Sequence, residues 1–332
     1  MLTFASLINN KNKAIMKVVV TGSLGNISKP LTEELVKKGH EVTVISSKAE
    51  KRIAIERLGA KAAIGSIEDV GFLTATFTGA DAVYCMMPVF DFVVDVMVET
   101  RRLIGNYCTA ILASGVKKVV HLSSIGAHTD KGNGILAFHH LAETMFRELP
   151  ADVIIKHIRP VGFYNNMEYN IEFMKGKGIL SYILALRFYG LIPMLKGQRG
   201  VIVSNYGGED KNPWVSPYDI AAAIAEEFTT PFMERKFRYV ASEELTCNEM
   251  AKMIGDAIGK PYLKWFLISD KEMFDALKSF KLSDDRAKGV VEMQAGSHTG
   301  SINEDFYRNK PVFGKVKFKD YVKDFAVVYN QK

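Results

Sequence analysis

Residues 17–31, with the sequence KVVVTGSLGNISKPL, decide the fold of this chain. Lys17–Thr21 is a run rich in β-branched residues that predicts a buried strand, and a helical pattern follows over Pro30–Lys38. Gly22 and Gly25 lie between the two. Glycines at such a junction allow a tight turn, and the free N–H groups at the start of the helix attract phosphate. The stretch therefore predicts a strand–turn–helix unit that binds a nucleotide.

Strand and helix patterns alternate through the first half of the chain. The predicted strands are 17–21, 41–46, 61–64, 82–85, 118–122 and 152–157, and the predicted helices are 30–38, 52–58, 93–114 and 136–148. Short, almost wholly apolar strands separated by helices are typical of a parallel sheet covered on both faces. We therefore predict an α/β fold with a Rossmann-like, doubly wound parallel sheet.

The residues after the second predicted strand indicate which dinucleotide is bound. A site for NAD(H) has an acidic residue there, about 20 residues after the glycine turn, for the ribose 2′-hydroxyl. This chain instead has Ser46 and Ser47, followed by Lys48, Lys51 and Arg52. Hydroxyl and cationic groups suit a 2′-phosphate through charge-assisted hydrogen bonds. We therefore favour NADP(H) over NAD(H); the alternative, that these cations form an ordinary solvated loop, stays open.

Composition argues against several other classes of protein. Of the 332 residues, 43 are basic and 37 acidic, a net charge of +6 without a basic cluster, which favours an anionic small molecule over a nucleic acid. The three cysteines are far apart and no residue set has metal-ligand spacing, so we expect no disulfide framework, no metal and a cytoplasmic location. The longest apolar run, Ile179–Leu195, contains Arg187 and Pro193. We interpret it as a buried or lid-like helix and expect no membrane partner.

Six segments of the chain resemble the NmrA-like group of atypical short-chain dehydrogenase/reductases. They are VVVTGSLGNISKPL (18–31), GADAVYCMMP (79–88), KKVVHLSSIGA (117–127), FHHLAETMF (138–146), IRPVGFYNNM (158–167) and WVSPYDIAAAIAEEF (214–228). The resemblance implies a Rossmann-like NADP-binding domain with a smaller C-terminal lobe. The group includes NADPH-dependent quinone reductases and also non-catalytic NADP-binding redox sensors that regulate transcription factors.

The composition changes after Pro160, where aromatic residues and methionines become frequent, and this change divides the chain. We expect residues 16–162, together with about 201–230, to form the NADP-binding domain. About 163–200 and 235–332 are expected to form a smaller α+β lobe that binds the substrate. Residues 1–15 are expected to be a flexible N-terminal extension.

The resemblance also implies which residues contact the cofactor. The pyrophosphate would lie against Gly22, Ser23, Leu24, Gly25, Asn26 and Ile27, and the 2′-phosphate against Ser46, Ser47, Lys48 and Arg52, with Ser47 where many relatives have an arginine. Ile67 would border the adenine, and Met86, Met87 and Pro88 the ribose. Ser123, His139, Pro160, Gly162 and Phe163 would line the nicotinamide half.

The proton donor of ordinary short-chain dehydrogenases is missing. These enzymes use a Tyr-x-x-x-Lys pair, and with the chain aligned on Glu143 the two places hold Ile135 and His139. Alcohol–ketone chemistry and epimerisation need a group that moves a proton, whereas hydride transfer to a quinone depends mainly on proximity and orientation. His139 and Ser124 are therefore the candidate catalytic residues.

The histidines of the predicted helix 136–149 differ in position. His139 and Glu143 lie together on the flank of the apolar face, four residues apart, where they could pair. His139 is expected to touch the ribose or to donate a proton near neutral pH, and a boundary histidine satisfied by Glu143 is the alternative. His140 is expected to face solvent, and His121 to be a core histidine.

These observations lead to one preferred function and two alternatives. We expect Phe163, Tyr164, Asn165, Asn166 and Met167 to border an apolar pocket for a flat substrate, although most of the aromatic run is expected to form the core of the lobe. The preferred function is an NADPH-dependent oxidoreductase acting on a quinone or a similar electron-poor planar compound. A redox sensor without turnover is the alternative, and an epimerase or dehydratase a weaker one. A homodimer or a regulatory protein partner is left open.

Overall fold

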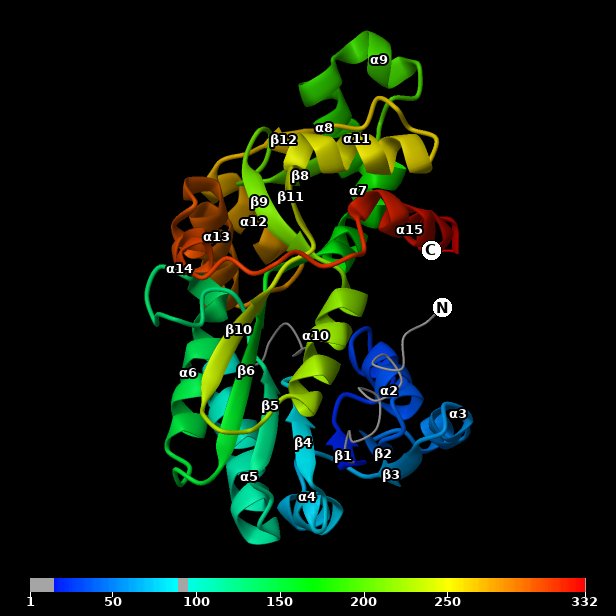
Figure 1. The fold of residues 1–332 in the computed structure, drawn as a ribbon. Helices are drawn as coiled ribbons and strands as arrows, with labels where there is room; N and C mark the ends of the chain where they lie inside the picture. The colour runs from blue at the N-terminus through cyan, green and yellow to red at the C-terminus, as the bar shows by residue number, and fades with distance from the viewer. Residues whose placement is uncertain (1–14, 89–94, 332) are drawn as a thin grey trace, which may run out of the picture.

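A computed structural model describes residues 15–88 and 95–331, so the expected extension at 1–15 lies almost wholly outside the described residues. The main element is a seven-stranded sheet in which every pair of neighbours is parallel (Figure 1). In spatial order its strands are β10 (Lys236–Val240), β6 (Ile154–Pro160), β5 (Lys118–Leu122), β4 (Ala82–Cys85), β1 (Lys17–Val20), β2 (Glu41–Ser46) and β3 (Lys61–Ile64). The strand order reverses between β1 and β4, so the predicted doubly wound sheet is confirmed.

Helices cover both faces of this sheet (Figure 1). One face carries α2 (Ser28–Lys37), α3 (Arg52–Arg57) and α10 (Pro217–Thr229), and the other α4 (Val70–Phe77), α5 (Val96–Ser114) and α6 (Ala137–Arg147). Successive strand residues point to opposite faces. Val18 and Val20 of β1 accordingly join the core under α2 and α10, and Val19 joins the core under α4, α5 and α6.

A second lobe lies beyond the carboxyl ends of these strands (Figure 1). Its strands are β7 (Gly162–Phe163), β9 (Lys211–Val215) and β11 (Glu243–Thr246) in one sheet, and β8 (Ile202–Ser204) and β12 (Trp265–Leu267) in another. Its α-helices are α7 (Ile171–Lys175), α8 (Gly178–Tyr189), α9 (Leu191–Leu195), α11 (Cys247–Ala257), α12 (Asp270–Ser279), α13 (Asp284–Thr299), α14 (Glu304–Arg308) and α15 (Phe318–Gln331). The short 3-10 helices of the chain are η1 (Ala49–Lys51) after β2, η2 (Gly134–Leu136) after β5, η3 (Tyr164–Asn170) after β7 and η4 (Ser301–Asn303) after α13.

The lobe has its own apolar core, in which Trp214, Trp265 and Phe325 are buried. α10 is capped as the sequence predicts, because the Ser216 hydroxyl accepts a hydrogen bond from Tyr218 N–H and Pro217 occupies the first turn. Within 15–88 and 95–331, no helix is long and apolar enough to cross a membrane.

Two segments lie in a different part of the fold from the one expected. β10 pairs with β6 at the edge of the main sheet, although about 235–332 was expected in the second lobe. β8 and β9, within 201–230, instead belong to the small sheets of that lobe.

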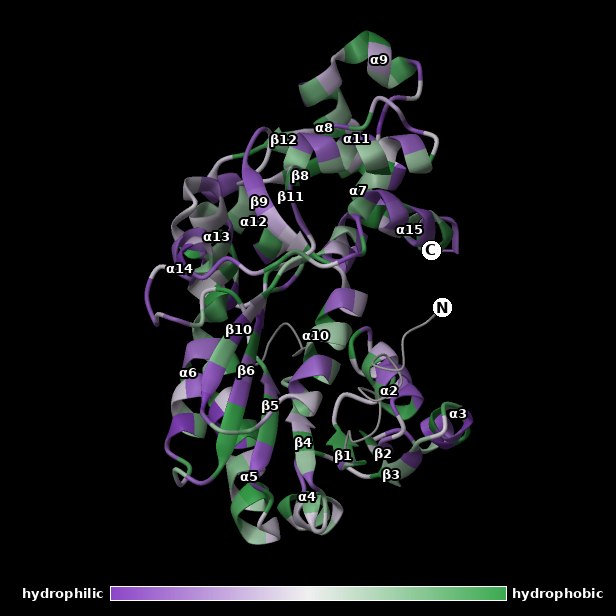
Figure 2. Ribbon diagram, in the orientation of Figure 1, coloured by the Kyte–Doolittle hydropathy of each residue, from purple (hydrophilic) through white to green (hydrophobic). Residues whose placement is uncertain are grey.

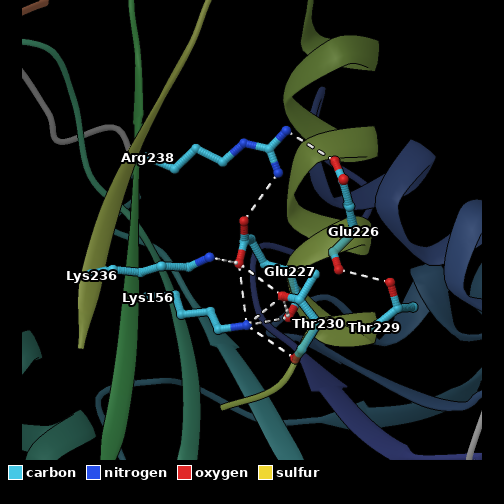
Figure 3. A network of polar contacts seen from close by, with 7 residues as sticks. All are labelled: Lys156, Glu226, Glu227, Thr229, Thr230, Lys236 and Arg238. Atoms are coloured by element: carbon cyan, nitrogen blue, oxygen red, sulfur yellow. Dashed lines mark hydrogen bonds and ion pairs between the residues drawn. The ribbon is translucent and has the colours of Figure 1, made fainter. Parts of the chain in front are cut away.

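A buried ionic network accompanies the pairing of β10 with β6 (Figure 3). Lys156 of β6 and Lys236 and Arg238 of β10 all contact Glu227, near the end of α10, at 3.2, 2.9 and 3.0 Å. Lys156 is 71 residues away from Glu227 in the sequence, and the other two contacts join different elements, so periodicity could not reveal the network.

Candidate functional site

The glycine turn after β1 is shaped by close contacts. Gly22 has a φ of +88°, and a Cβ there would lie 2.5 Å from Ser28 Oγ, so the position requires glycine. Ser28 is buried, and its hydroxyl donates to the carbonyl of Thr21 at 2.8 Å. Ser23 has a φ of +55°, and its hydroxyl donates to Ser46 Oγ at 2.9 Å. The turn is therefore held against both β1 and β2.

The start of α2 suits an anion. No side chain caps this end of the helix, and the first turn contains no acidic residue. Asn26 is exposed beside it, whereas Ile27 is buried and Leu24 packs partly against the core. Backbone N–H groups and the helix dipole at such an end favour phosphate, and Gly22 leaves the approach free of a side chain.

The polar residues after β2 separate into two groups. Ser46 is buried, and its Oγ accepts hydrogen bonds from Ser23 and from the backbone N–H of Lys48, at 2.9 and 3.2 Å, so it braces the turn. Ser47 and Lys48 are exposed, as is Arg52, whose Nη1 lies 3.8 Å from Glu56. The exposed group is cationic, which fits a phosphate better than an uncharged ribose.

The remaining predicted cofactor residues follow the ends of β3, β4, β5 and β6. Because the strands are parallel, these ends lie at one edge of the sheet. Ile67 follows β3, and Met86, Met87 and Pro88 follow β4. Ser123 and Ser124 follow β5, Pro160 ends β6, and Gly162 and Phe163 come after it as β7. Met86 is fixed there because its N–H donates to Thr21 Oγ1 at 3.1 Å and its carbonyl accepts from the Tyr107 hydroxyl at 3.0 Å.

A buried ionic network braces the end of β6. Arg159 donates from Nε to Glu143 Oε1 at 2.9 Å and from Nη2 to Glu143 Oε2 at 2.7 Å. The hydroxyl of Ser123 donates to the same carboxylate at 2.6 Å. Arg159 also lies 3.3 Å from Asp305 of α14, which accepts from the Tyr239 hydroxyl at 2.6 Å. The network thus joins the cofactor edge of the sheet to α14.

This arrangement corrects the expected pairing of His139 with Glu143. Both oxygens of Glu143 accept from Arg159, because a buried guanidinium needs a counter-charge. His139 packs against Phe138, and its buried Nδ1 has no hydrogen-bond partner within the described residues. Burial lowers the pKa of His139 to about 4, so its ring is neutral at pH 7. It offers a hydrogen bond rather than the acidic proton expected near neutral pH.

Two other histidines lie in the interior. His140 was expected to face solvent, but it is half-buried and its Nδ1 lies 3.0 Å from the carbonyl of Ala127. The loop after β5 folds back over α6, which the helical pattern alone does not show. His121 is a core histidine, as predicted, with its Nδ1 3.0 Å from that of His157.

The place of the missing tyrosine lies beneath α13. Ile135 is half-buried in η2, and a Cβ on Gly289 of α13 would lie 3.1 Å from its backbone N. Ile135 supplies no proton-donating side chain, and α13 packs closely on its backbone at Gly289.

The expected substrate pocket is only partly formed by the residues assigned to it. Tyr164 and Met167 are buried in the core of the lobe, because the 3-10 turn η3 directs both inward. The Tyr164 hydroxyl donates to Glu243 at 2.6 Å. Phe163 and Asn165 are half-buried, and Asn166 is exposed. The aromatic run from Tyr164 to Met174 is therefore mainly core, as expected for most of it.

Arg159, Asp305 and Trp214 lie at the site but were not among the residues predicted from the sequence. Arg159 lies within a buried strand, and such a charge demands a partner, so that signal was present. Trp214 gave no signal of its own. Its ring carbons lie 3.0 and 3.1 Å from where a Cβ at Gly162 would be, so it closes that side of the expected nicotinamide segment.

Comparison with known proteins supports a nucleotide-binding fold. Residues 22–178 match a family model described as NAD(P)H-binding. An uncharacterised protein of Schizosaccharomyces pombe is 24% identical over 293 residues, which are 84% of this chain and 93% of the relative. The family match agrees with the predicted NAD(P)-binding domain in the first half of the chain.

Solved structures of this fold include reductases and epimerases. The NADPH-dependent quinone oxidoreductase of Escherichia coli is 20% identical, with a TM-score of 0.67 over 93% of this chain and 99% of that chain. The triphenylmethane reductase of Citrobacter sp. is 17% identical, with a TM-score of 0.68 over 94% and 99%. A nucleoside-diphosphate-sugar epimerase of Staphylococcus aureus is 12% identical, with a TM-score of 0.69 over 93% and 100%. At these identities the likeness shows the fold.

Proposed function

Since residues 22–178 match the NAD(P)H-binding family, we propose that this chain is an NADPH-dependent oxidoreductase that transfers a hydride to a quinone or a similar electron-poor planar compound. The observation that carries the proposal is the turn with Gly22, Gly25 and Ser28 at its small-residue places, combined with Ile135 in place of a proton-donating tyrosine. A quinone accepts a hydride readily and forms a comparatively stable hydroquinone anion, so the reaction depends mainly on orientation. A quinone oxidoreductase has the same fold.

The proposed binding mode assigns each part of the cofactor to residues at the carboxyl edge of the sheet. NADPH would supply the hydride. Gly22–Ile27 and the start of α2 would hold its pyrophosphate, and Lys48 and Arg52 its 2′-phosphate. The neutral ring of His139, whose Nδ1 has no hydrogen-bond partner among the described residues, would hydrogen-bond the nicotinamide ribose. Gly162 and Phe163 would border the nicotinamide.

A redox sensor that binds NADP(H) without turnover is the second candidate function. It is favoured by the hydrogen bonding near the site: the Ser123 hydroxyl and Arg159 both donate to Glu143, so neither Ser123 nor Glu143 is free to transfer a proton to a substrate. His139 is neutral at pH 7. An epimerase or dehydratase needs a proton-transfer group and is disfavoured for the same reason.

The proposed activity is tested by following NADPH oxidation with the full chain and a panel of quinones, with NADH in parallel. We expect quinone-dependent oxidation that is faster with NADPH. A folded chain that binds NADPH but turns over none of the acceptors would make the sensor the preferred function.

Replacing Lys48 and Arg52 with Ala tests the NADP(H) preference. Each side chain would supply a charge-assisted contact, so we expect each substitution to raise the KM for NADPH about tenfold and to leave that for NADH unchanged. Lys252→Ala, at an exposed position on α11, is the matched control. Equal effects on both cofactors would instead indicate a solvated loop without a role in 2′-phosphate binding.

A further inference from the structure

The second lobe has an apolar surface that no described residue covers. Ile179, Ile183 and Leu186 of α8, and Leu191, Ile192 and Leu195 of α9, are each between 48% and 82% exposed. We call these six side chains the α8–α9 surface. In Figure 1 α9 is the outermost helix of the lobe, and Figure 2 shows hydrophobic residues on it.

The exposure of this surface differs from the buried or lid-like helix expected for Ile179–Leu195. α8 directs small residues, Ser181 and Ala185, into the protein, and Phe188 stacks on Phe266 of β12 at 4.2 Å. Those contacts hold the helix and leave its larger aliphatic side chains outside. A helix that is apolar on both faces is normally covered on both, and a contiguous exposed apolar patch marks a binding surface.

The charged residues of α8, α9 and their flanking segments are all cationic. Residues 173–208 contain no Asp or Glu. Lys177 directly precedes α8 and Lys196 directly follows α9; both are exposed. Arg187 is paired with Glu272 at 2.6 Å. The apolar surface is therefore bordered at both ends by exposed cations.

We propose that the α8–α9 surface docks this protein on an anionic phospholipid bilayer. Isoleucine and leucine side chains enter the boundary between headgroups and acyl chains, and lysines at the margin meet the acidic headgroups. α8 has 12 residues, whereas about 20 are needed to cross a bilayer, so the helices would lie in the interface. The earlier expectation of no membrane partner considered only spanning segments.

A second copy of the chain fits this surface less well. In a two-fold dimer each patch meets the same patch of the other copy, so Lys177 and Lys196 would meet a surface to which residues 173–208 contribute no acidic residue. Cations brought together across an interface without acidic partners disfavour association. An acidic lipid surface has the complementary charge.

Vesicle flotation of the full chain tests the proposal. We expect binding to phosphatidylcholine vesicles that contain phosphatidylserine, weaker binding to phosphatidylcholine alone, and loss of binding as salt is raised. Ile183→Ser with Leu186→Ser should lower the partition coefficient at least about tenfold. Lys177→Gln and Lys196→Gln should each lower it about fivefold.

The controls replace side chains that are exposed elsewhere. Val312→Ser, at a side chain 98% exposed, and Lys319→Gln, at an exposed lysine on α15, should leave vesicle binding unchanged. Circular dichroism and NADPH binding would show that every variant is folded.

Two results would overturn the proposal. One is a folded chain that does not bind phosphatidylserine vesicles, or whose binding survives the Ile183 and Leu186 substitutions. The other is a concentration-dependent dimer, seen by sedimentation velocity, that the same substitutions abolish. None of these positions is in the proposed cofactor site. The quinone reductase proposal is therefore tested separately, by its own NADPH oxidation assay.

Discussion

At Gly22 the backbone itself forms part of the proposed cofactor site. Its φ of +88° and the 2.5 Å approach of a Cβ to Ser28 Oγ make any side chain both strained and obstructed. We expect Gly22→Ala to weaken NADPH binding at least about tenfold, because the start of α2 must move away from β1. Isothermal titration would measure the loss.

Gly39→Ala is the matched control for Gly22→Ala. Gly39 has a φ of +86°, but a Cβ there would have no neighbour within 4 Å. Both substitutions should cost about 1 kcal/mol of stability from the left-handed backbone, and only Gly22→Ala should affect the cofactor. Equal effects on NADPH affinity would show that loss of stability, rather than the turn, explains the result.

At the scale of elements, ion pairs join β10 to the end of α10. Glu227 is 2% exposed, and burial by itself would raise its pKa, but hydrogen bonds from Lys236, Arg238 and Lys156 lower the pKa to about 2 (Figure 3). The carboxylate therefore stays ionised. It holds the last turn of α10 against β6 and β10.

Glu227→Gln should destabilise the chain strongly. Removal of the charge leaves three cations close together, one of them fully buried, and breaking a buried pair costs about 3–5 kcal/mol. Asp256→Asn, which breaks the exposed Lys252–Asp256 pair, should cost less than about 1 kcal/mol. Urea unfolding measures both, and similar losses for the two variants would contradict the assigned role of Glu227.

Over the whole molecule, buried histidines make stability dependent on pH. Burial lowers the pKa of His121, of His139 to about 4 and of His157 to about 3. An unfolded histidine has a pKa of about 6.5, so the unfolded state binds protons first as pH falls. The stability due to neutral histidines is fully present above pH 6.5 and is lost as pH falls through the folded values.

Urea unfolding should therefore show a free energy of unfolding that changes little between pH 7.5 and about 6.5 and falls steadily from there to pH 4.5. His139 alone would account for about 3 kcal/mol once the pH has fallen below its folded pKa. His139→Gln should make the dependence shallower, and His128→Gln, on the exposed loop after β5, should change it less. An unchanged slope in His139→Gln would show that this ring is not a buried neutral group.

The two parts of the molecule are joined by charge as well as by chain. Arg159 contacts both Glu143 beneath the proposed cofactor site and Asp305 of α14. Any movement of α14 relative to the sheet must therefore break or carry this buried pair.

Local sequence was enough to determine the strand–turn–helix unit and the strands of the sheet. β2, β3, β4 and β5 begin and end at the predicted residues, because short, mainly apolar runs between helices already specify a parallel strand. The glycine turn was also predictable, since its close contact with Ser28 joins residues that are at most seven positions apart in the sequence. The apolar face of α10 and its Ser216 cap followed from the same kind of local pattern.

Only the tertiary structure decided which distant groups meet. The pairing of β10 with β6, the use of Glu143 by Arg159 rather than His139, and the inward turn of Tyr164 each depend on a partner far away in the chain. The exposure of α8 and α9 is decided in the same way, because an apolar helix looks identical in sequence whether or not another element covers it. Periodicity records which side of an element is apolar, but burial and charge pairing depend on what the rest of the fold brings to that side.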